Sequence, residues 1–193
     1  MTCTLETAHL RLTPRHAEVA LSAGSAGERL DGRFSGPEPR VRGDGAEIAV
    51  AYPRFRIAQP LADRVAELRL DPSVAWIIDI EGGAARLVAD LSGLTLRELT
   101  IAGGVRDVAL LLPVPEGHVP VRIEGGASKL SITRPAATAA ALWIAGGATR
   151  LAFDGQHYGA IGGEVRLASP GFEDAADRFA VQVRGGASGL TVA

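Results

Sequence analysis

Residues 80–91 read IEGGAARLVADL, and four close copies of this phrase follow in the chain. They are IAGGVRDVALLL from Ile101, IEGGASKLSITR from Ile123, IAGGATRLAFDG from Ile144 and VRGGASGLTVA from Val183. The first glycines of the pairs are 21, 22, 21 and 39 residues apart, at Gly82, Gly103, Gly125, Gly146 and Gly185. A phrase that returns at such an interval is typical of a repeat protein.

Each repeat predicts two short strands on either side of a glycine corner. In residues 119–133, VPVRIEGGASKLSIT, apolar residues alternate with more polar ones before the glycines, and Leu130 and Ile132 resume the alternation after them. This period of two is the pattern of strands with one buried face. Glycine suits the bend because it has no Cβ to obstruct a positive φ or a neighbouring backbone. A small residue is expected to fill each corner of a narrow core: Ala84, Val105, Ala127, Ala148 and Ala187.

The repeats predict an all-β fold. Units of about 21 residues that cannot bury their own apolar face are expected to stack into a β-solenoid of short two-strand coils. A β-sandwich is the alternative, since it fits the alternation equally well but does not require similar corners at a fixed interval. Only 5% of residues are aromatic, so ladders of aliphatic side chains are expected to fill the core.

The N-terminal third repeats less regularly. We expect residues 1–70 to form β coils that cap the stack and residues 71–193 to form the Gly-Gly-Ala solenoid, within one continuous domain. A weaker copy, VRGDGAEIAV, starts at Val41, so the triplet Arg42-Gly43-Asp44 is interpreted as another corner rather than as an adhesive tripeptide. Residues 60–70 fit a short helix or a strand, and the strand is favoured.

Composition narrows the functional classes. The chain carries 20 basic and 22 acidic residues and a net charge of −2, which gives no general attraction to nucleic acid. Its single cysteine, Cys3, cannot form an internal disulfide. The N-terminus lacks the pattern of a signal peptide and no apolar run approaches 18 residues, so we expect a cytoplasmic protein without membrane insertion.

The run from Trp76 to Ala193 resembles a group of actinobacterial proteins with GGAS-type repeats. The resemblance rests on DPSVAWIIDIEGGAARL, VPVRIEGGASKLSITRP, FDGQHYGAIGGEVRLASPGFEDAADRF and the terminal GGASGLTV. More distantly the run is similar to adhesin-like and toast-rack β-solenoids and to the stacked coils of bactofilins. The resemblance implies a pile of short β-coils that serves as a scaffold, an interaction surface or a polymer unit. It implies no catalytic residue.

No motif in the chain predicts catalysis or a cofactor. The four histidines, His9, His16, His118 and His157, lie in different segments without metal-ligand spacing, so no metal site is expected. There is no nucleophile elbow, and the glycine pairs are followed by strands rather than by the helix that a phosphate loop requires. Enzymatic activity is therefore disfavoured. Trp76 and Trp143 are expected to cover the core or one of its ends.

Two groups of residues are candidate binding sites. The double-length gap, residues 154–178, predicts an insert with its own strand near residues 164–168, which either caps the stack or binds a ligand. The candidate ligand residues of the insert are His157, Tyr158, Glu164, Arg166 and Asp177. Aligned corners would also place Arg86, Lys129 and Arg150 in one basic column with Asp107, which either discourages aggregation or holds an acidic partner.

The sequence thus favours a non-enzymatic structural or protein-interaction module. Its expected partner is another protein or a second copy, with a symmetric dimer as the commonest closed assembly. Association is expected through the C-terminal edge, GGASGLTVA, or through a sheet face. The alternative is a ligand-binding or carbohydrate-binding protein, less favourably a polysaccharide-acting enzyme, that uses the insert. The sequence does not identify the ligand.

Overall fold

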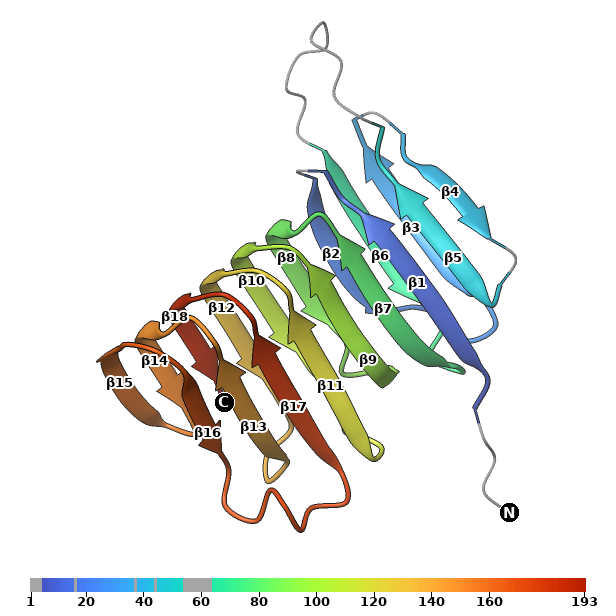
Figure 1. Ribbon diagram of the computed structural model, residues 1–193. Helices are drawn as coiled ribbons and strands as arrows, with labels where there is room; N and C mark the ends of the chain where they lie inside the picture. The colour runs from blue at the N-terminus through green and yellow to red at the C-terminus, as the bar shows by residue number, and fades with distance from the viewer. Residues whose placement is uncertain (1–4, 16, 37, 44, 54–63) are drawn as a thin grey trace, which may run out of the picture.

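The computed structural model describes residues 5–15, 17–36, 38–43, 45–53 and 64–193, which form two nine-stranded β-sheets lying face to face (Figure 1). In order along the stack, sheet A contains β16 (Val165–Ala168), β13 (Ala139–Ile144), β17 (Arg178–Val183), β11 (His118–Ile123), β9 (Thr95–Ala102), β7 (Ala75–Glu81), β1 (Thr7–Thr13), β5 (Glu47–Ala51) and β4 (Arg40–Gly43). Sheet B contains β15 (Gln156–Ile161), β14 (Ala148–Phe153), β18 (Ala187–Val192), β12 (Ala127–Thr133), β10 (Val105–Leu111), β8 (Ala84–Asp90), β2 (Glu18–Ala23), β6 (Val65–Leu70) and β3 (Leu30–Ser35). The described residues contain no helix.

The prediction of an all-β fold is confirmed. Each predicted repeat is one strand of sheet A followed by one strand of sheet B, which we call a unit. Equivalent strands of neighbouring units pair in parallel, as β10 does with β12 and β8. At both ends of each sheet the last strand is antiparallel to its neighbour. The sheets are therefore mixed, and they do not close into a barrel.

The order of units in space differs from their order in the sequence. The C-terminal unit, β17–β18, lies between β11–β12 and β13–β14 rather than at the edge. The double-length gap contributes a reversed unit, β15–β16, which forms that edge instead. The expectation that the segment GGASGLTVA presents an open edge is therefore wrong, because both strands of its unit have neighbours on each side.

The N-terminal residues belong to the same two sheets. The unit β1–β2 is internal, and the reversed unit β3–β4 forms the second end of the stack. The segment Val65–Leu70 is a strand, whereas residues 60–63 lie outside the described residues. The interpretation of Arg42 and Gly43 as part of a corner is wrong, because both residues belong to β4, which pairs antiparallel with β5 within sheet A. Asp44 itself lies outside the described residues.

The glycine corners allow units to approach each other closely. A Cβ built on Gly125 would lie 2.6 Å from the carbonyl carbon of Gly103 and 2.6 Å from the nitrogen of Gly104. Hydrogen bonds also run along the corners, such as that from the Ala127 N–H to the Gly186 carbonyl at 2.9 Å. The small residue after each glycine pair is buried, as predicted.

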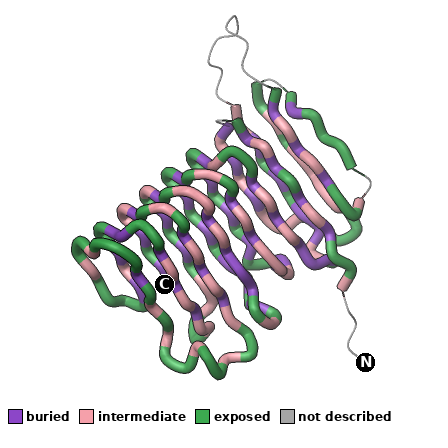
Figure 2. The backbone as a smooth tube through the Cα atoms, in the orientation of Figure 1, coloured by how far each residue is buried: buried purple, intermediate pink, exposed green. Residues whose placement is uncertain are grey.

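The core is a continuous cluster that runs from Ala8 to Val192 (Figure 2). It consists mainly of aliphatic side chains that point inward at alternating positions, except that strands of sheet B such as β8 have two consecutive outward residues near their start. Trp76 is 0% exposed, and its indole N–H donates to the Asp71 carbonyl oxygen at 2.8 Å. Since the inward residues hold the sheets together, function must be sought among the outward ones.

Candidate functional site

The insert residues predicted as a ligand site lie on separate surfaces. His157 and Tyr158 belong to edge strand β15 of sheet B, where His157 is exposed and Tyr158 packs against the core. Glu164 and Arg166 lie at edge strand β16 of sheet A, on the other side of the molecule. Asp177 lies in the loop before β17, where its carboxylate accepts the Gly117 N–H at 2.6 Å. Ligand binding by these five residues stays a prediction.

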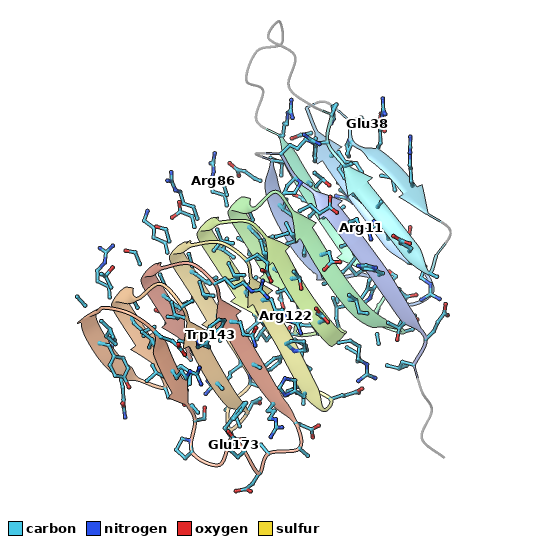
Figure 3. All side chains as sticks on the ribbon, in the orientation of Figure 1. Arg11, Glu38, Arg86, Arg122, Trp143 and Glu173 are labelled. Atoms are coloured by element: carbon cyan, nitrogen blue, oxygen red, sulfur yellow. The ribbon has the colours of Figure 1, made fainter. Side chains whose placement is uncertain are left out.

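Two of the five candidate ligand residues, Glu164 and Arg166, pair directly with each other. The Glu164 carboxylate accepts hydrogen bonds from the Arg166 guanidinium and from the Trp143 indole N–H, the latter at 2.8 Å. These bonds, the one from Arg166 first, lower the pKa of Glu164. Trp143 lies on the outer face of sheet A (Figure 3), so its ring partly covers the edge of that face. Trp143 and Tyr158 belong to different sheets and form no surface pair.

The predicted column of charged residues lies at equivalent positions of sheet B. Arg86, Asp107, Lys129 and Arg150 all have positive φ, between 51° and 59°, at a kink just inside each strand. Gly189 takes the same position in β18 and interrupts the column between Lys129 and Arg150, because β18 lies between β12 and β14. We call these five positions the kink column.

Most charges of the kink column have partners within the chain. Arg86 pairs with Glu18 of the neighbouring strand, and the Lys129 ammonium lies 3.1 Å from the Asp107 carboxylate. Arg150 donates to the Ser188 hydroxyl at 3.1 Å. Figure 3 shows the Arg86 side chain projecting away from the core at this edge. The column is thus a mixed row of charges rather than a purely basic one.

A shallow groove follows the glycine corners beside this column. It has a volume of about 500 Å³ and is lined by Gly82, Gly83, Ala84, Ala85, Gly104, Val105, Arg106, Gly126, Ala127, Ser128 and Gly186. Arg106 is the one charged residue in this lining. The groove follows from the missing side chains of the corners, and it is open to solvent rather than shaped around a ligand.

The outer face of sheet A is covered with ion pairs between neighbouring strands. His9 lies 2.7 Å from the Asp79 carboxylate, and Arg122 pairs with Glu98. Further along the stack, Glu124 lies 2.8 Å from Arg184. Figure 3 shows Arg11 and Arg122 on this face. Such pairs keep a sheet face solvated, because exposed charges retain their water and oppose contact with another protein surface.

The outer face of sheet B is uncharged along its middle. Its central column consists of the aligned outward residues of five consecutive strands, Val88, Ala109, Ser131, Thr191 and Ala152. Val88 is 59% exposed, and Leu111, two positions beyond Ala109, is 38% exposed. The sequence predicts association through a sheet face but does not indicate which one. The signal of this face was present in the second strand of every repeat, where the middle outward position never carries a charge.

The described residues show neither a metal site nor a membrane-spanning helix. Among the described residues, no group of three His, Cys, Asp or Glu side chains is arranged to hold a metal ion. Cys3 and His16 lie outside the described residues. No helix in the described part of the chain is long and apolar enough to span a membrane.

Comparison with known proteins identifies the fold but no family. No protein-family model matches the chain. No curated protein matches it either. A crystal structure described as that of a "putative cell adhesion protein" from Clostridium sporogenes aligns with a TM-score of 0.73 over 98% of this chain and 94% of the other, at 17% identity. At this identity the likeness concerns the fold alone, which this chain therefore shares with that protein over nearly the whole length of both.

Proposed function

We propose that this chain is a non-enzymatic protein-interaction module, built as a two-sided β-solenoid, that binds through the outer face of sheet B. The observation that carries the proposal is the difference between the two outer faces. Sheet A carries ion pairs across its strands, whereas the central column of sheet B has no charge over five strands and leaves Val88 exposed, with the exposed Leu111 beside it on β10.

This difference matches what separates an interface from an ordinary surface. The buried centre of a protein–protein interface is depleted of charged residues, whereas its rim is polar. Contiguous exposed apolar residues on a soluble protein often mark such a site. The parallel pairing of successive units supports the solenoid, and the adhesion protein that shares the fold is compatible with a role in contact between proteins.

A ligand site in the insert is the weaker proposal. Its five candidate residues lie on three surfaces, so one small ligand would not reach them together. Glu164, Arg166 and Trp143 form a polar cluster, but each polar group there already has a partner in the chain.

Site-specific photo-cross-linking tests the proposed surface. A photoreactive phenylalanine analogue is placed at Ala109, on the outer face of sheet B, and in a matched protein at Ala102, an exposed alanine on the sheet A strand of the same unit. Irradiation in cells that make the protein should give protein adducts from position 109 and few from position 102. A second substitution, Val88→Glu, should remove the adducts. Equal adducts from both positions, or adducts from 102 alone, would refute the proposal.

A further inference from the structure

The outer face of sheet B has three aligned columns of residues on β8, β10, β12, β18 and β14. The kink column begins the strands, and the uncharged central column follows it. An end column completes the face with Asp90, Leu111, Thr133, Ala193 and Asp154. Along β8 this places Arg86, Val88 and Asp90 two residues apart, so that strand has a cation at one side of the face and an anion at the other.

Asp90 lacks a cationic partner among the described residues. Its carboxylate accepts only the Ser92 N–H and hydroxyl, at 3.1 and 2.6 Å. Asp154 differs, because its carboxylate is engaged by Arg134 and by the Ser169 hydroxyl. Asp90 therefore presents an exposed anion, held by Ser92 but without a cation among the described residues, at the side of the face opposite Arg86.

We propose that the partner of this face is a second copy of the same chain, related by a two-fold axis that lies in the interface parallel to the direction of stacking. The inference rests on the proposed function and names its partner. Rotation about this axis exchanges the two sides of the face while keeping each strand at its own level. It brings Arg86 of one copy opposite Asp90 of the other, twice by symmetry, and it places the central column against itself.

Repulsion between like charges disfavours the alternative two-fold axis, which is parallel to the strands. A two-fold axis parallel to the strands, centred on β12, reverses the stack and leaves each side of the face in place. It would set Arg86 opposite Arg150 and Lys129 opposite its own copy. Like charges in direct opposition across an interface cost several kcal/mol. With the axis along the stack, the Lys129–Asp107 ion pair instead meets the uncharged Thr133 and Leu111, and no like charges coincide on these five strands. Glu67 of β6 and Arg33 of β3 continue the central column two and three strands beyond β8, outside this five-strand contact.

The size of the face predicts a weak dimer. Five strands about 4.8 Å apart and five residues about 3.3 Å apart cover roughly 24 by 16 Å. Such a contact falls in the class below about 1,200 Å² of total buried surface, which is typical of transient complexes. We therefore expect a dissociation constant on the order of 0.1 mM.

Sedimentation equilibrium of the full chain tests the dimer. Between about 20 µM and 1 mM the average mass should rise from that of the monomer toward that of the dimer. Ala109→Arg sets two cations against each other across the axis and should weaken association at least tenfold. Ala102→Arg is the matched control on the same unit and should leave association unchanged. Circular dichroism verifies that both variants are folded.

Mixing variants tests the axis. Ala109→Arg and Ala109→Glu should each remain monomeric, and an equimolar mixture should form a heterodimer, because residue 109 faces its own copy. A wild-type monomer at about 1 mM, or an Ala109→Arg variant that dimerises normally, overturns the inference. So does a mixture that stays monomeric, or rescue of Ala109→Arg by Thr191→Glu instead, which is the pairing that the other axis predicts. Cross-links from position 109 to a different protein would overturn this inference while leaving the proposed function intact, whereas absence of cross-links would remove both.

Discussion

Replacing Gly125 by alanine should separate two units of the stack. The added Cβ would lie 2.6 Å from the Gly103 carbonyl carbon and from the Gly104 nitrogen, and 2.8 Å from the Gly103 oxygen. These are backbone atoms that cannot rotate away, so the neighbouring corner must retreat by roughly 0.8 Å to reach van der Waals contact. That movement stretches the hydrogen bond from the Glu124 N–H to the Ile101 oxygen, now 3.0 Å.

The expected loss of stability follows from these terms. Overpacking a close contact costs about 1–3 kcal/mol, and the weakened hydrogen bond about 1 kcal/mol. The lower entropy of the unfolded alanine chain returns about 0.4–1 kcal/mol. Gly125→Ala should therefore lower the free energy of unfolding by about 1–3.5 kcal/mol.

Gly104→Ala is the matched control on the same row of corners. A Cβ there would meet only the Gly126 oxygen, at 3.4 Å, and the φ of Gly104 is not in the left-handed region. Its cost should stay below about 1 kcal/mol. Urea unfolding followed by circular dichroism measures both variants. Equal stabilities for Gly125→Ala and Gly104→Ala would refute the close packing of the corners.

Three further predictions concern the kinks, the acidic turns and the tryptophans. Gly189→Val should destabilise the fold by about 2 kcal/mol and Gly189→Asn by less than about 1 kcal/mol, since a β-branched residue resists the positive φ of 66° that asparagine tolerates; thermal unfolding compares them. Hydrogen bonds from the Ser92 hydroxyl and N–H lower the pKa of Asp90, so its contribution to stability is present above the unfolded pKa near 3.8 and is lost as the pH falls through the lower folded value. Urea midpoints measured across this acidic range should fall, and Asp90→Asn should reduce the fall. Iodide should quench the fluorescence of a Trp76→Phe variant, which retains half-buried Trp143, and should hardly affect a Trp143→Phe variant, which retains the fully buried Trp76; equal quenching would contradict their placement.

The strands and corners were predictable because they depend on local chemistry. Alternating residues such as Val119, Val121 and Ile123 mark a strand with one buried face, and a glycine pair marks each bend. The order of stacking was not predictable in this way, because nearly identical strands fit several neighbours. The position of β18 between β12 and β14 depends on the whole set of pairings.

One local feature of the sequence does indicate the reordering. Asp154-Gly155, between β14 and β15, has positive φ at both residues, and this dipeptide is a strong signal for a tight hairpin. It reverses the chain and makes β15–β16 the edge unit. The insert and the kink column were predictable as candidate sites because they contain charged residues. The proposed surface instead consists of uncharged outward residues. That these residues form one surface is evident only from the strand registers, which align Val88, Ala109 and Ser131 on one face.

The central claim is that a second copy covers the outer face of sheet B, and covalent footprinting tests it most directly. Carbene labelling of the full chain is measured by mass spectrometry at about 20 µM and about 1 mM, on either side of the expected dissociation constant. Labelling of Val88 and Leu111 should fall at the higher concentration, while labelling of Arg11 and Arg122 on sheet A should not change. Protection confined to sheet A, or no protection on either face, would contradict the account.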